Sequence, residues 1–507
     1  MIKIEVNSVR GRILNCPDEL ARKINKFCSY RVYNYQFSDA YINGHWDGYV
    51  RKFSIKTRTF PSGLLYRISK IIEKEGIGCS ITDRRKKFNW TKERVLKNLE
   101  GFKFSLRPYQ IEGLITGLRI PYLVFWWATS AGKTVQFAAL ISALREKEYR
   151  NTLILVANRD LASQHRKELG SMLDTSIGLI EEGRFEPKKI TVAVINTLWQ
   201  RAIKGKNKQV LSYLEGIEHL ISDETHHIID SKMFKQTINK CINTIARHGF
   251  SGTPFSLTTD DVELESVTGP PLSRVTMSQL IEEGWVSTPH IFMIRYDSSP
   301  IGRTYNYASL YSQGIVKNAV RNRIITEVVS GEYFNSESVS ILVLIRIIEH
   351  GKLIRDLLLE EGIDRDQIEY IHGSTPGFVR EEVKDKFKRK DIRIVIASSI
   401  WSEGIDIPTV DVLFKADGGG GKEITEDKGI RAVIQNVGRV IRKPIKNGEL
   451  DVDTEQENIV RIYDLFDGAN SVLASQSMNR FMTFKMEKKF IVKEVRYDPG
   501  KSKAPFI

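Results

Sequence analysis

The sequence ATSAGKT at residues 128–134 decides the fold of this chain, together with the segments on either side of it. The apolar run at residues 122–126 has the length of a buried strand, and residues 134–144 have the composition of a helix. A loop that leads into a helix presents free backbone N–H groups, and the helix dipole there favours an anion. The stretch therefore predicts a phosphate-binding loop.

Each residue type in this loop suits a triphosphate. Gly132 allows the backbone to approach a phosphate, Lys133 can reach the β and γ phosphates, and the Thr134 hydroxyl can ligate Mg²⁺. The general pattern begins with glycine, and Trp127 stands in that place here. The predicted nucleotide contacts of the loop are Ser130, Ala131, Gly132, Lys133 and Thr134.

Short apolar segments recur along the chain, and each is followed by a helical or polar stretch. The first series lies at residues 122–126, 152–156, 191–195, 219–222 and 247–250. The second lies at residues 340–344, 369–371, 392–396, 410–414 and 459–463. This alternation is typical of parallel sheets covered on both faces, so we predict two successive α/β domains.

An acidic pair follows the segment at residues 219–222, at the carboxyl end of a predicted strand, where open α/β sheets bind ligands. Asp223 is expected to hold Mg²⁺ and Glu224 to polarise the attacking water. His226 and His227 allow a metal site or a coupling role for His226. Because no third ligand lies at metal spacing, we favour coupling. Residues 251–254 are then placed to sense the phosphate.

The sequence QNVGRVIR at residues 435–442 places Arg439 and Arg442 three residues apart, on one face of a helix. An arginine held over the γ phosphate stabilises the transition state and contributes a rate factor of about 10³–10⁵. Two helical arginines are more commonly surface charges. The neighbouring Gln435 and Gly438 favour a catalytic role for the stretch.

The composition excludes several classes of protein. With 507 residues, 41% of them hydrophobic, the chain is long enough for about three domains, and its longest apolar run is far shorter than a membrane span. Its four cysteines form no Cys-x-x-Cys pair, so a zinc site and a disulfide framework are unsupported. No secretory signal is visible, and we expect a cytoplasmic, monomeric protein.

The formal charge of +14 is concentrated at the front of the chain, where residues 1–90 hold 18 Lys and Arg but only eight Asp and Glu. Such a surplus binds polyanions or serves solubility. The pattern of residues 1–98 predicts a small α+β domain, with strands at residues 2–6, 49–53 and 57–60 and helices at residues 18–27 and 64–74. Beside the other motifs, nucleic-acid binding is the better interpretation.

Aromatic side chains alternate with cations in this front domain. Trp46, Tyr49, Phe53 and Phe60 could stack on bases, or they could form the core of the domain. We favour the core interpretation, because alternate strand positions must point inward. The cations would then grip duplex or junction DNA by themselves.

In this order, the motifs resemble those of the superfamily 2 helicases of the DExH type, over roughly residues 100–470. Residues 106–110 look like the adenine-reading segment of that family, which implies a base contact by Gln110 with Arg107 beside it. Residues 158–164 and 196–198 resemble the strand-tracking motifs. Residues 397–408 are similar to motif V, which implies that Gly404 and Asp406 contact the nucleotide, and residues 435–442 are similar to motif VI.

The front domain, with NGHWDG at residues 43–48, most resembles that of the UvsW-type helicases of tailed phages. This resemblance implies two RecA-like lobes, at residues 99–300 and 301–507, with a helical extension at the C-terminus. It also implies ATP and Mg²⁺ as cofactors and branched DNA or RNA–DNA hybrids as substrates. The implied work is branch migration, fork regression and R-loop unwinding, in recombination, repair and replication.

Two other functions stay open at this point. The chain could be the motor of a restriction or processing complex, which translocates on duplex DNA without separating its strands. It could also be an annealing or scaffold protein whose ATP site is vestigial. Five intact residues argue against that: Lys133, Asp223, Glu224, Arg439 and Arg442.

Overall fold

The structure is a computed structural model that describes the chain except for residues 33, 86–89, 146–147, 253–260, 303–305, 399–409, 419–436, 439–444, 447–448, 451–458 and 499–507. The chain divides into two compact units, Met1–Val275 and Thr276–Ile507. Each unit contains one large sheet.

The large sheet of the first unit has eight strands, which are parallel except for the edge strand β10. In spatial order its strands are β10 (Arg184–Glu186), β9 (Gly178–Glu181), β11 (Ile190–Val194), β8 (Thr152–Val156), β12 (His219–Ser222), β13 (Ala246–Ser251), β7 (Tyr122–Trp127) and β14 (Ser273–Val275). Its helices are α4 (Lys92–Leu99), α5 (Pro108–Arg119), α6 (Lys133–Ala143), α7 (Arg159–Leu173), α8 (Ile195–Trp199), α9 (Lys208–Glu215), α10 (His227–Asp230), α11 (Lys232–Ile238) and α12 (Asp261–Thr268).

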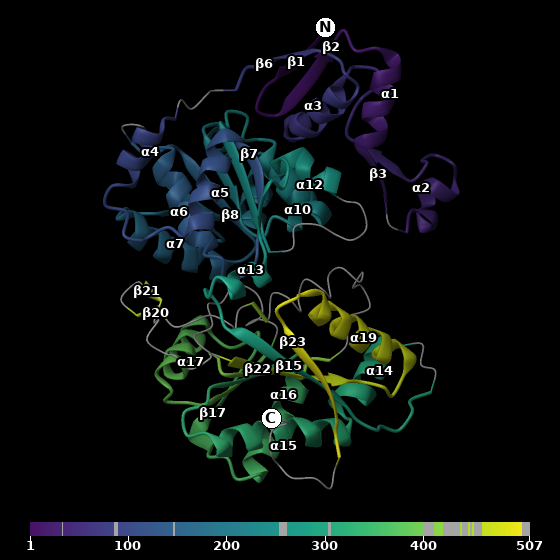
Figure 1. Ribbon diagram of the computed structural model, residues 1–507, viewed down its shortest axis with the longest axis vertical. Helices are drawn as coiled ribbons and strands as arrows, with labels where there is room; N and C mark the ends of the chain where they lie inside the picture. The colour runs from purple at the N-terminus through teal and green to yellow at the C-terminus, as the bar shows by residue number, and fades with distance from the viewer. Residues whose placement is uncertain are drawn as a thin grey trace. The chain divides into compact units, whose positions relative to one another are not determined.

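Helices cover both faces of this sheet. Figure 1 shows β7 and β8 between a layer that contains α5, α6 and α7 and a layer that contains α10 and α12. Every residue of β8 and of β11 is buried, which explains why the predicted strands read as continuous apolar runs rather than as alternating patterns. The predicted strands at residues 152–156 and 219–222 coincide with β8 and β12.

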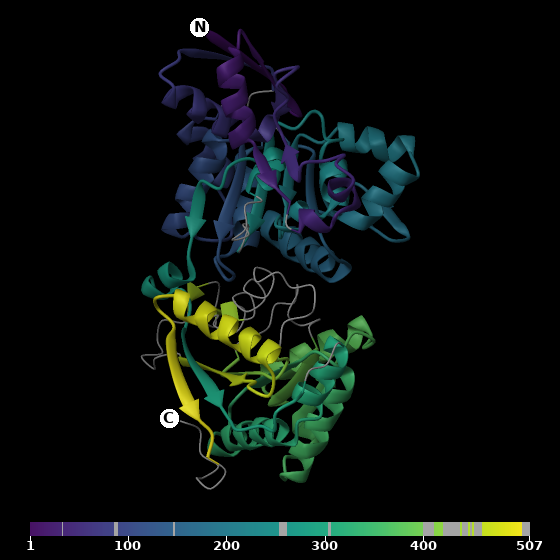
Figure 2. The same ribbon diagram turned by 90° about the vertical axis from the view of Figure 1, so that its right-hand side faces the viewer.

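The second unit contains a seven-stranded sheet in which every strand pair is parallel. In spatial order its strands are β17 (Ile368–Ile371), β18 (Ile394–Ser398), β16 (Ile341–Ile345), β19 (Val412–Lys415), β22 (Ile459–Phe466), β15 (Thr288–Arg295) and β23 (Ile491–Arg496). Its helices are α13 (Met277–Glu282), α14 (Tyr307–Tyr311), α15 (Ala319–Asn335), α16 (Ile348–Glu360), α17 (Gly377–Arg389) and α19 (Ser471–Met486). Figure 2 shows this second layered unit, in which α19 packs on β22.

The structure therefore confirms the predicted fold class, two α/β domains with parallel sheets behind a small α+β domain. It differs from the prediction at two places in the second unit. The expected boundary after residue 300 would leave β15 in the first domain, but β15 pairs with β22 and β23. The expected helical C-terminus contains α19 and then β23, because hydrogen bonds along β15 hold the last described segment as a strand.

The front of the chain forms a four-stranded sheet in the order β5 (Thr59–Pro61), β2 (Arg10–Leu14), β1 (Ile2–Val6) and β6 (Cys79–Asp83). It is accompanied by α1 (Asp18–Phe27), α3 (Leu65–Lys74), the short helix α2 (Asp39–Ile42) and the strand pair β3 (Ser29–Arg31) and β4 (Tyr49–Arg51). We call residues 1–85 the front module.

The predicted end of the front domain at residue 98 falls inside α4, which belongs with the first large sheet. This helix packs on α6, and the side-chain amide of Asn98 donates to the carbonyls of Ala143 at 3.2 Å and Arg145 at 2.8 Å. Phe53 and Phe60 lie in the core of the front module, as the core interpretation predicted. For the other two aromatics that interpretation is wrong, because Trp46 is only half-buried and Tyr49 is exposed.

The front module and the first large sheet share a core, and α12 connects them. Val262 of α12 is buried in the same cluster as Phe53 and Phe60. The backbones also approach closely, since a Cβ atom on Gly63 would lie 2.1 Å from the carbonyl oxygen of Glu265. The hydroxyl groups of Tyr122 and Thr244 share a hydrogen bond of 2.8 Å. The Tyr122 hydroxyl also donates to the carbonyl of Ser8 at 2.9 Å.

Two glutamates of α12 extend this junction with ion pairs. The side chain of Glu263 is 1% exposed and pairs with Lys52 at 2.7 Å and with Lys235 of α11 at 2.9 Å. Glu265 accepts two hydrogen bonds of 2.7 Å from the guanidinium of Arg67. Planar, bidentate pairs of this kind are the strongest ion pairs in proteins. The front module is therefore packed onto α12 and does not depend on the chain connection alone.

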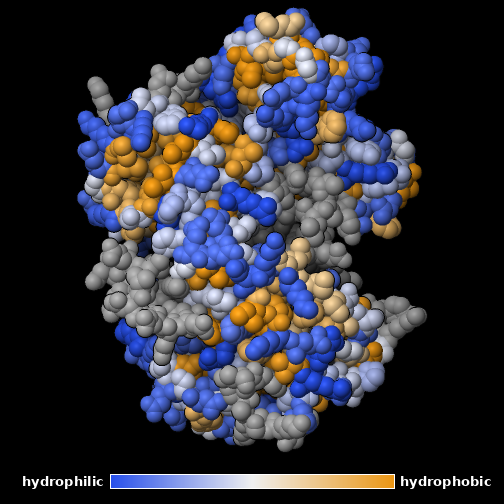
Figure 3. Space-filling view, viewed as in Figure 1, coloured by the Kyte–Doolittle hydropathy of each residue, from blue (hydrophilic) through white to orange (hydrophobic). Residues whose placement is uncertain are grey.

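Among the described residues, no helix combines the length and the hydropathy that crossing a bilayer requires. Figure 3 shows apolar side chains in separate patches among hydrophilic ones, one of them over α4 and α5. Leu96, Ile111 and Ile115 are exposed on these two helices.

Replacing Glu263 by glutamine is expected to loosen the front module in a pH-dependent way. Burial disfavours the charged carboxylate, but hydrogen bonds from Lys52 and Tyr30 outweigh it and lower the pKa of Glu263 below 4.5. The carboxylate therefore stabilises the fold in full above about pH 4.5, and this contribution is lost as the pH falls through the lowered pKa. At neutral pH the variant should lose about 2 kcal/mol of local stability.

Hydrogen exchange of the β1 and β2 amides measures this change. The matched control is Glu73→Gln, which removes an exposed carboxylate that pairs with Lys70. The control should exchange as the wild type does. An unchanged exchange rate in Glu263→Gln at neutral pH would contradict the role given to this carboxylate.

Candidate active site

The loop between β7 and α6 has the backbone conformation of an anion site. Ser130 and Gly132 have φ angles of 71° and 74°, in the left-handed region, and α6 begins at Lys133. Gly132 occupies the N-cap position and has no side chain with which to cap the helix. The first amides of α6 therefore point into the loop, where a phosphate can accept their hydrogen bonds.

Side chains from α5 fix this loop. The amide of Gln110 donates to the carbonyls of Ala131 at 3.2 Å and Gly132 at 3.4 Å, and the hydroxyl of Tyr109 donates to Ala131 at 3.1 Å. Gln110 is 2% exposed, and its side-chain oxygen Oε1 accepts a hydrogen bond of 2.9 Å from the backbone N–H of Arg107. The structure thus shows Gln110 supporting the loop, while its contact with adenine stays a prediction.

Gly132 is required for this arrangement. A Cβ atom there would lie 2.6 Å from the side-chain nitrogen of Gln110, and the positive φ angle is itself unfavourable for other residues. The loop therefore requires glycine at position 132, where the side-chain amide of Gln110 lies opposite it.

The acidic pair lies beside the loop, at the carboxyl end of β12. Lys133 Nζ is 3.3 Å from Glu224 Oε1, and both side chains are mostly buried. Glu224 has a φ angle of 44°, which turns the chain out of the strand. Asp223 is 5% exposed, and its Oδ1 accepts from the backbone N–H of Glu224 at 3.0 Å. The structure therefore brings together Lys133, Asp223 and Glu224, as the sequence predicted.

The other oxygen of Asp223 contacts a histidine that the sequence analysis did not single out. His165 Nε2 of α7 lies 2.9 Å from Asp223 Oδ2, and both side chains are buried. Burial disfavours the charged imidazole, but the hydrogen bond and the charge of Asp223 outweigh it and raise the pKa of His165. The Asp223 carboxylate is therefore held by N–H donors on both of its oxygens.

The segment that follows the acidic pair contacts β13. His226 Nδ1 lies 2.9 Å from the hydroxyl of Ser251 and 3.4 Å from Glu224 Oε2. The carbonyl of Gly252 accepts a hydrogen bond of 3.0 Å from the indole of Trp126 on β7. The histidine joins the acidic pair to Ser251, and the indole joins Gly252 to β7; these two residues are the first half of the predicted sensing segment. Thr253 and Pro254 lie outside the described residues.

The donor set fits a nucleotide-bound magnesium ion. The Thr134 hydroxyl and the Asp223 carboxylate are oxygen ligands of the kind that Mg²⁺ prefers, next to a loop that suits phosphates. Within the described part of the chain, no group of three or more His, Cys, Asp or Glu could hold a metal. An ion at this place would therefore take its other ligands from phosphates and water.

Five predicted site residues cannot be placed. Gly404, Asp406, Gln435, Arg439 and Arg442 lie outside the residues that the structure describes. Their roles stay predictions from the resemblance of their motifs.

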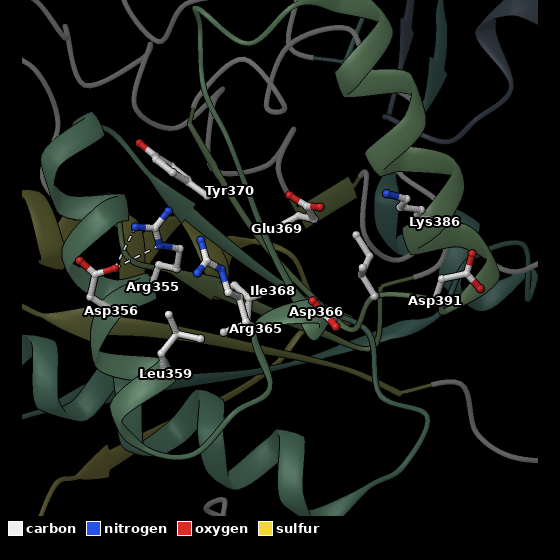
Figure 4. Close-up of a pocket in the computed structure, with 11 residues that line it drawn as sticks. Arg355, Asp356, Leu359, Arg365, Asp366, Ile368, Glu369, Tyr370, Lys386 and Asp391 are labelled. Carbon is white, nitrogen blue, oxygen red and sulfur yellow. Dashed lines mark hydrogen bonds and ion pairs between the residues drawn. The ribbon is translucent and has the colours of Figure 1, made fainter.

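A cavity of about 640 Å³ lies in the second unit, between α16, β17 and α17 (Figure 4). Its lining contains charges of both signs, and Arg355 donates to its neighbour Asp356 at 2.9 Å. Its lining includes Arg365 and Ile368, which lie at the amino end of β17. The predicted motifs, in contrast, follow the carboxyl ends of strands. This cavity is therefore not part of the predicted site.

The residues that sequence reasoning missed are supports rather than direct nucleotide contacts: Tyr109, Trp126 and His165. A signal for His165 was available, because it lies three residues after the buried Ala162 and four before the buried Leu169. A polar side chain on the apolar face of a helix needs a buried partner. The sequence alone does not say that the partner is Asp223.

Two family models match the chain. The model described as type III restriction enzyme, res subunit, matches residues 103–256, and the helicase conserved C-terminal domain matches residues 322–444. The first match contains the phosphate loop and the acidic pair. The second contains the strands β16, β17, β18 and β19 of the second unit and the predicted arginine stretch.

Named relatives are helicases and translocases. A putative DNA 3'-5' helicase Rad25 of Haloarcula marismortui is 27% identical over 67% of this chain, and the chain spans about half the length of that relative, 51%. The DNA 3'-5' translocase XPB2 of Sulfurisphaera tokodaii is 25% identical, over 82% of this chain and 93% of the relative.

A solved structure shares the fold. Dbp5 of S. cerevisiae, bound to RNA and ADP BeF3, matches 80% of this chain and 93% of its own with a TM-score of 0.52 at 16% identity. UvsW of bacteriophage T4 matches 98% of this chain and 99% of its own at 21% identity, with a TM-score of 0.44. Both large sheets are RecA-like lobes, and the helicase domains imply the use of ATP. These matches confirm the resemblance to the superfamily 2 helicases that the sequence motifs indicate.

Proposed function

We propose that this chain is an ATP-driven DNA helicase or translocase that remodels branched DNA, by branch migration, fork regression or R-loop unwinding. The observation that carries the proposal is the ion pair between Lys133 and Glu224, at the open N-terminus of α6. It places a cation for phosphates next to a carboxylate for water, which is the arrangement that phosphoryl transfer to water needs.

The chain's own residues divide this reaction among them. The amides of α6 and Lys133 bind the phosphates, so Lys133 must exchange Glu224 for a phosphate oxygen when nucleotide enters. Glu224 is then available to orient the attacking water. Thr134 and Asp223 would hold Mg²⁺, which neutralises charge on the phosphates when bound.

Contacts beyond the nucleotide would couple hydrolysis to movement. His226 contacts both Glu224 and Ser251. A movement of the Glu224 side chain would therefore shift His226 and, through it, the end of β13. In the second lobe, we assign charge stabilisation to Arg439 and Arg442 and nucleotide contacts to Gln435, Gly404 and Asp406. This assignment rests on the similarity of their motifs to motifs V and VI.

DNA is the substrate class that the relatives and the charge of the chain favour. Both relatives described above carry DNA in their names. Several cations of the front module already form ion pairs with carboxylates of this chain. Arg51 pairs with Asp47, Arg58 with Asp18 and Arg67 with Glu265. The remaining exposed cations must therefore supply the contacts to DNA.

Arg10 and Arg12 are the best candidates for such contacts. They occupy alternate, exposed positions of β2, so they share one face of the strand. Arg10 also lines a hollow of about 810 Å³ between β5, the segment after β4 and Asn239 of the first lobe. A phosphate backbone that follows this hollow would meet the guanidinium of Arg10, and that of Arg12 lies two positions along the same face of β2.

Two alternatives predict different behaviour. A motor that only translocates on duplex DNA would hydrolyse ATP on duplex and leave forks intact. A scaffold with a vestigial site would not hydrolyse ATP. The contact of Lys133 with Glu224 and the donors on both oxygens of Asp223 weigh against the scaffold, because the groups that hydrolysis needs are all present and held in place.

Lys133→Ala and Glu224→Gln test the proposed reaction. Both variants should lose ATP turnover by about a hundredfold or more, since each removes a group that acts on the reacting phosphate or water. Both should still bind DNA. Lys133→Ala should also lose nucleotide affinity, whereas Glu224→Gln should keep it. The measurements are ATP turnover and strand displacement on forks, four-way junctions and RNA–DNA hybrids.

The matched control is Lys208→Ala, which also removes a lysine from the first position of a helix in this lobe, but an exposed one that is distant in sequence from the loop. It should behave as the wild type does. Turnover in Lys133→Ala equal to that of the wild type would contradict the proposal. Wild-type turnover on duplex DNA with every branched substrate left intact would favour the duplex motor.

Arg10→Ala/Arg12→Ala tests the DNA contact of the front module. The double variant should weaken junction binding and reduce the slope of log affinity against log salt by roughly 2, one for each lost phosphate contact. ATP affinity should not change. Substitutions are preferable to deletion of the module, because deletion would expose Val262 and the buried Glu263.

The control for charge is Arg22→Ala/Lys26→Ala, which removes two exposed cations from α1 of the same module. A much smaller change in the salt slope is expected for this pair. Equal losses from both double variants would show that net charge, and not the β2 face, determines binding.

A further inference from the structure

The buried contact between His165 and Asp223 links two elements that are distant in the chain. Asp223 follows β12, whereas His165 lies in the middle of α7. The side chain of Asp223 is 7% exposed and that of His165 is 5% exposed. The distance from His165 Nε2 to Asp223 Oδ2 is 2.9 Å. An ionised carboxylate can only accept hydrogen bonds, so Nε2 of His165 must carry the proton.

The imidazole of His165 is fixed in place on its other sides. Its ring lies 5.4 Å from the ring of Phe137 on α6, the helix that begins at the phosphate loop. Its Nδ1 is buried and has no hydrogen-bond partner among the described residues. The bond to Asp223 is therefore the polar contact that sets the orientation of the ring, and the packed ring in turn sets the carboxylate.

The carboxylate of Asp223 has little freedom as a result. Its Oδ1 accepts from the backbone of Glu224 at 3.0 Å and its Oδ2 from His165. These two bonds restrict the orientation of the carboxylate and leave one lone pair on each oxygen for a ligand. Carboxylates that ligate metals are commonly held in this way, and losing such a support costs roughly 10–100-fold in metal affinity or activity.

We propose that His165 is a positioning residue, which holds the Asp223 carboxylate in the orientation that takes the Mg²⁺ of the bound nucleotide. The inference rests on the proposed function, since it concerns the same nucleotide site. It assigns to α7 a role at this site besides the strand-tracking role that the resemblance of residues 158–164 implies.

Two substitutions separate the hydrogen bond from the packing. His165→Leu keeps most of the buried volume and removes the donor. His165→Gln has a side-chain amide with a reach similar to that of Nε2, so it can restore the N–H donor. The readout is the affinity for fluorescent ADP, measured with excess Mg²⁺ and with EDTA. The ratio of the two affinities is the magnesium gain.

The magnesium gain of His165→Leu should fall by about tenfold or more, while its affinity in EDTA stays that of the wild type. His165→Gln should recover most of the gain. His350→Leu is the matched control, because His350 is also buried and its Nε2 contacts a side-chain oxygen, that of Asn322, at 2.9 Å. Its magnesium gain should equal that of the wild type.

Two results would overturn the inference: a full magnesium gain in His165→Leu, or equal losses with Mg²⁺ and with EDTA. If His165→Leu does not fold, His165→Asn replaces it, because its shorter amide reaches only the position of Nδ1. The inference then fails if asparagine and glutamine give the same gain. A wild-type chain without any magnesium gain would contradict the proposed function itself, which keeps the two failures distinct.

Discussion

The parallel pairing of β12 with β8 on one side and with β13 on the other is the constraint on which the site depends. In this register Ser222 lies opposite Leu155 of β8 and Gly249 of β13, so the three strands end together. β13 in turn pairs with β7, with Ser251 opposite Trp126. The phosphate loop, the acidic pair and the sensing segment therefore meet at one edge, although they are far apart in the chain. A slip of one residue would turn Asp223 to the other face of the sheet.

The front module depends on the same sheet through α12. This helix follows β13 in the chain, contributes Val262 to the core of the module and holds Lys52 and Arg67 through its two glutamates. The module thus packs on an element that lies close in sequence to Ser251, the partner of His226. This packing explains why we treat the module as part of the first unit rather than as a tethered domain.

Much of the fold could be predicted because each lobe buries its strands on both faces, and such strands appear as short apolar runs in the sequence. Two strands at the sheet edges were missed for the same reason. β10 and β23 are partly exposed, so their residues do not form apolar runs. The phosphate loop and the acidic pair could be predicted because their chemistry is local to a few consecutive residues.

The supports of the site could not be predicted. His165 contacts Asp223 across 58 positions of the chain, and Glu263 contacts Lys52 across more than 200, so both contacts depend on the tertiary fold. The prediction that Gln110 contacts the base did not foresee its bonds to the phosphate loop. A side chain's partner is set by packing between elements, which no local pattern in the sequence records.

A crystal structure of the chain with Mg²⁺ and a non-hydrolysable ATP analogue would test the central claim most directly. The account predicts the phosphates at the N-terminus of α6, Lys133 moved from Glu224 onto a phosphate oxygen, and Asp223 beside the metal with its bond to His165 intact. Nucleotide bound elsewhere, or a Lys133–Glu224 pair that persists beside bound phosphates, would contradict it.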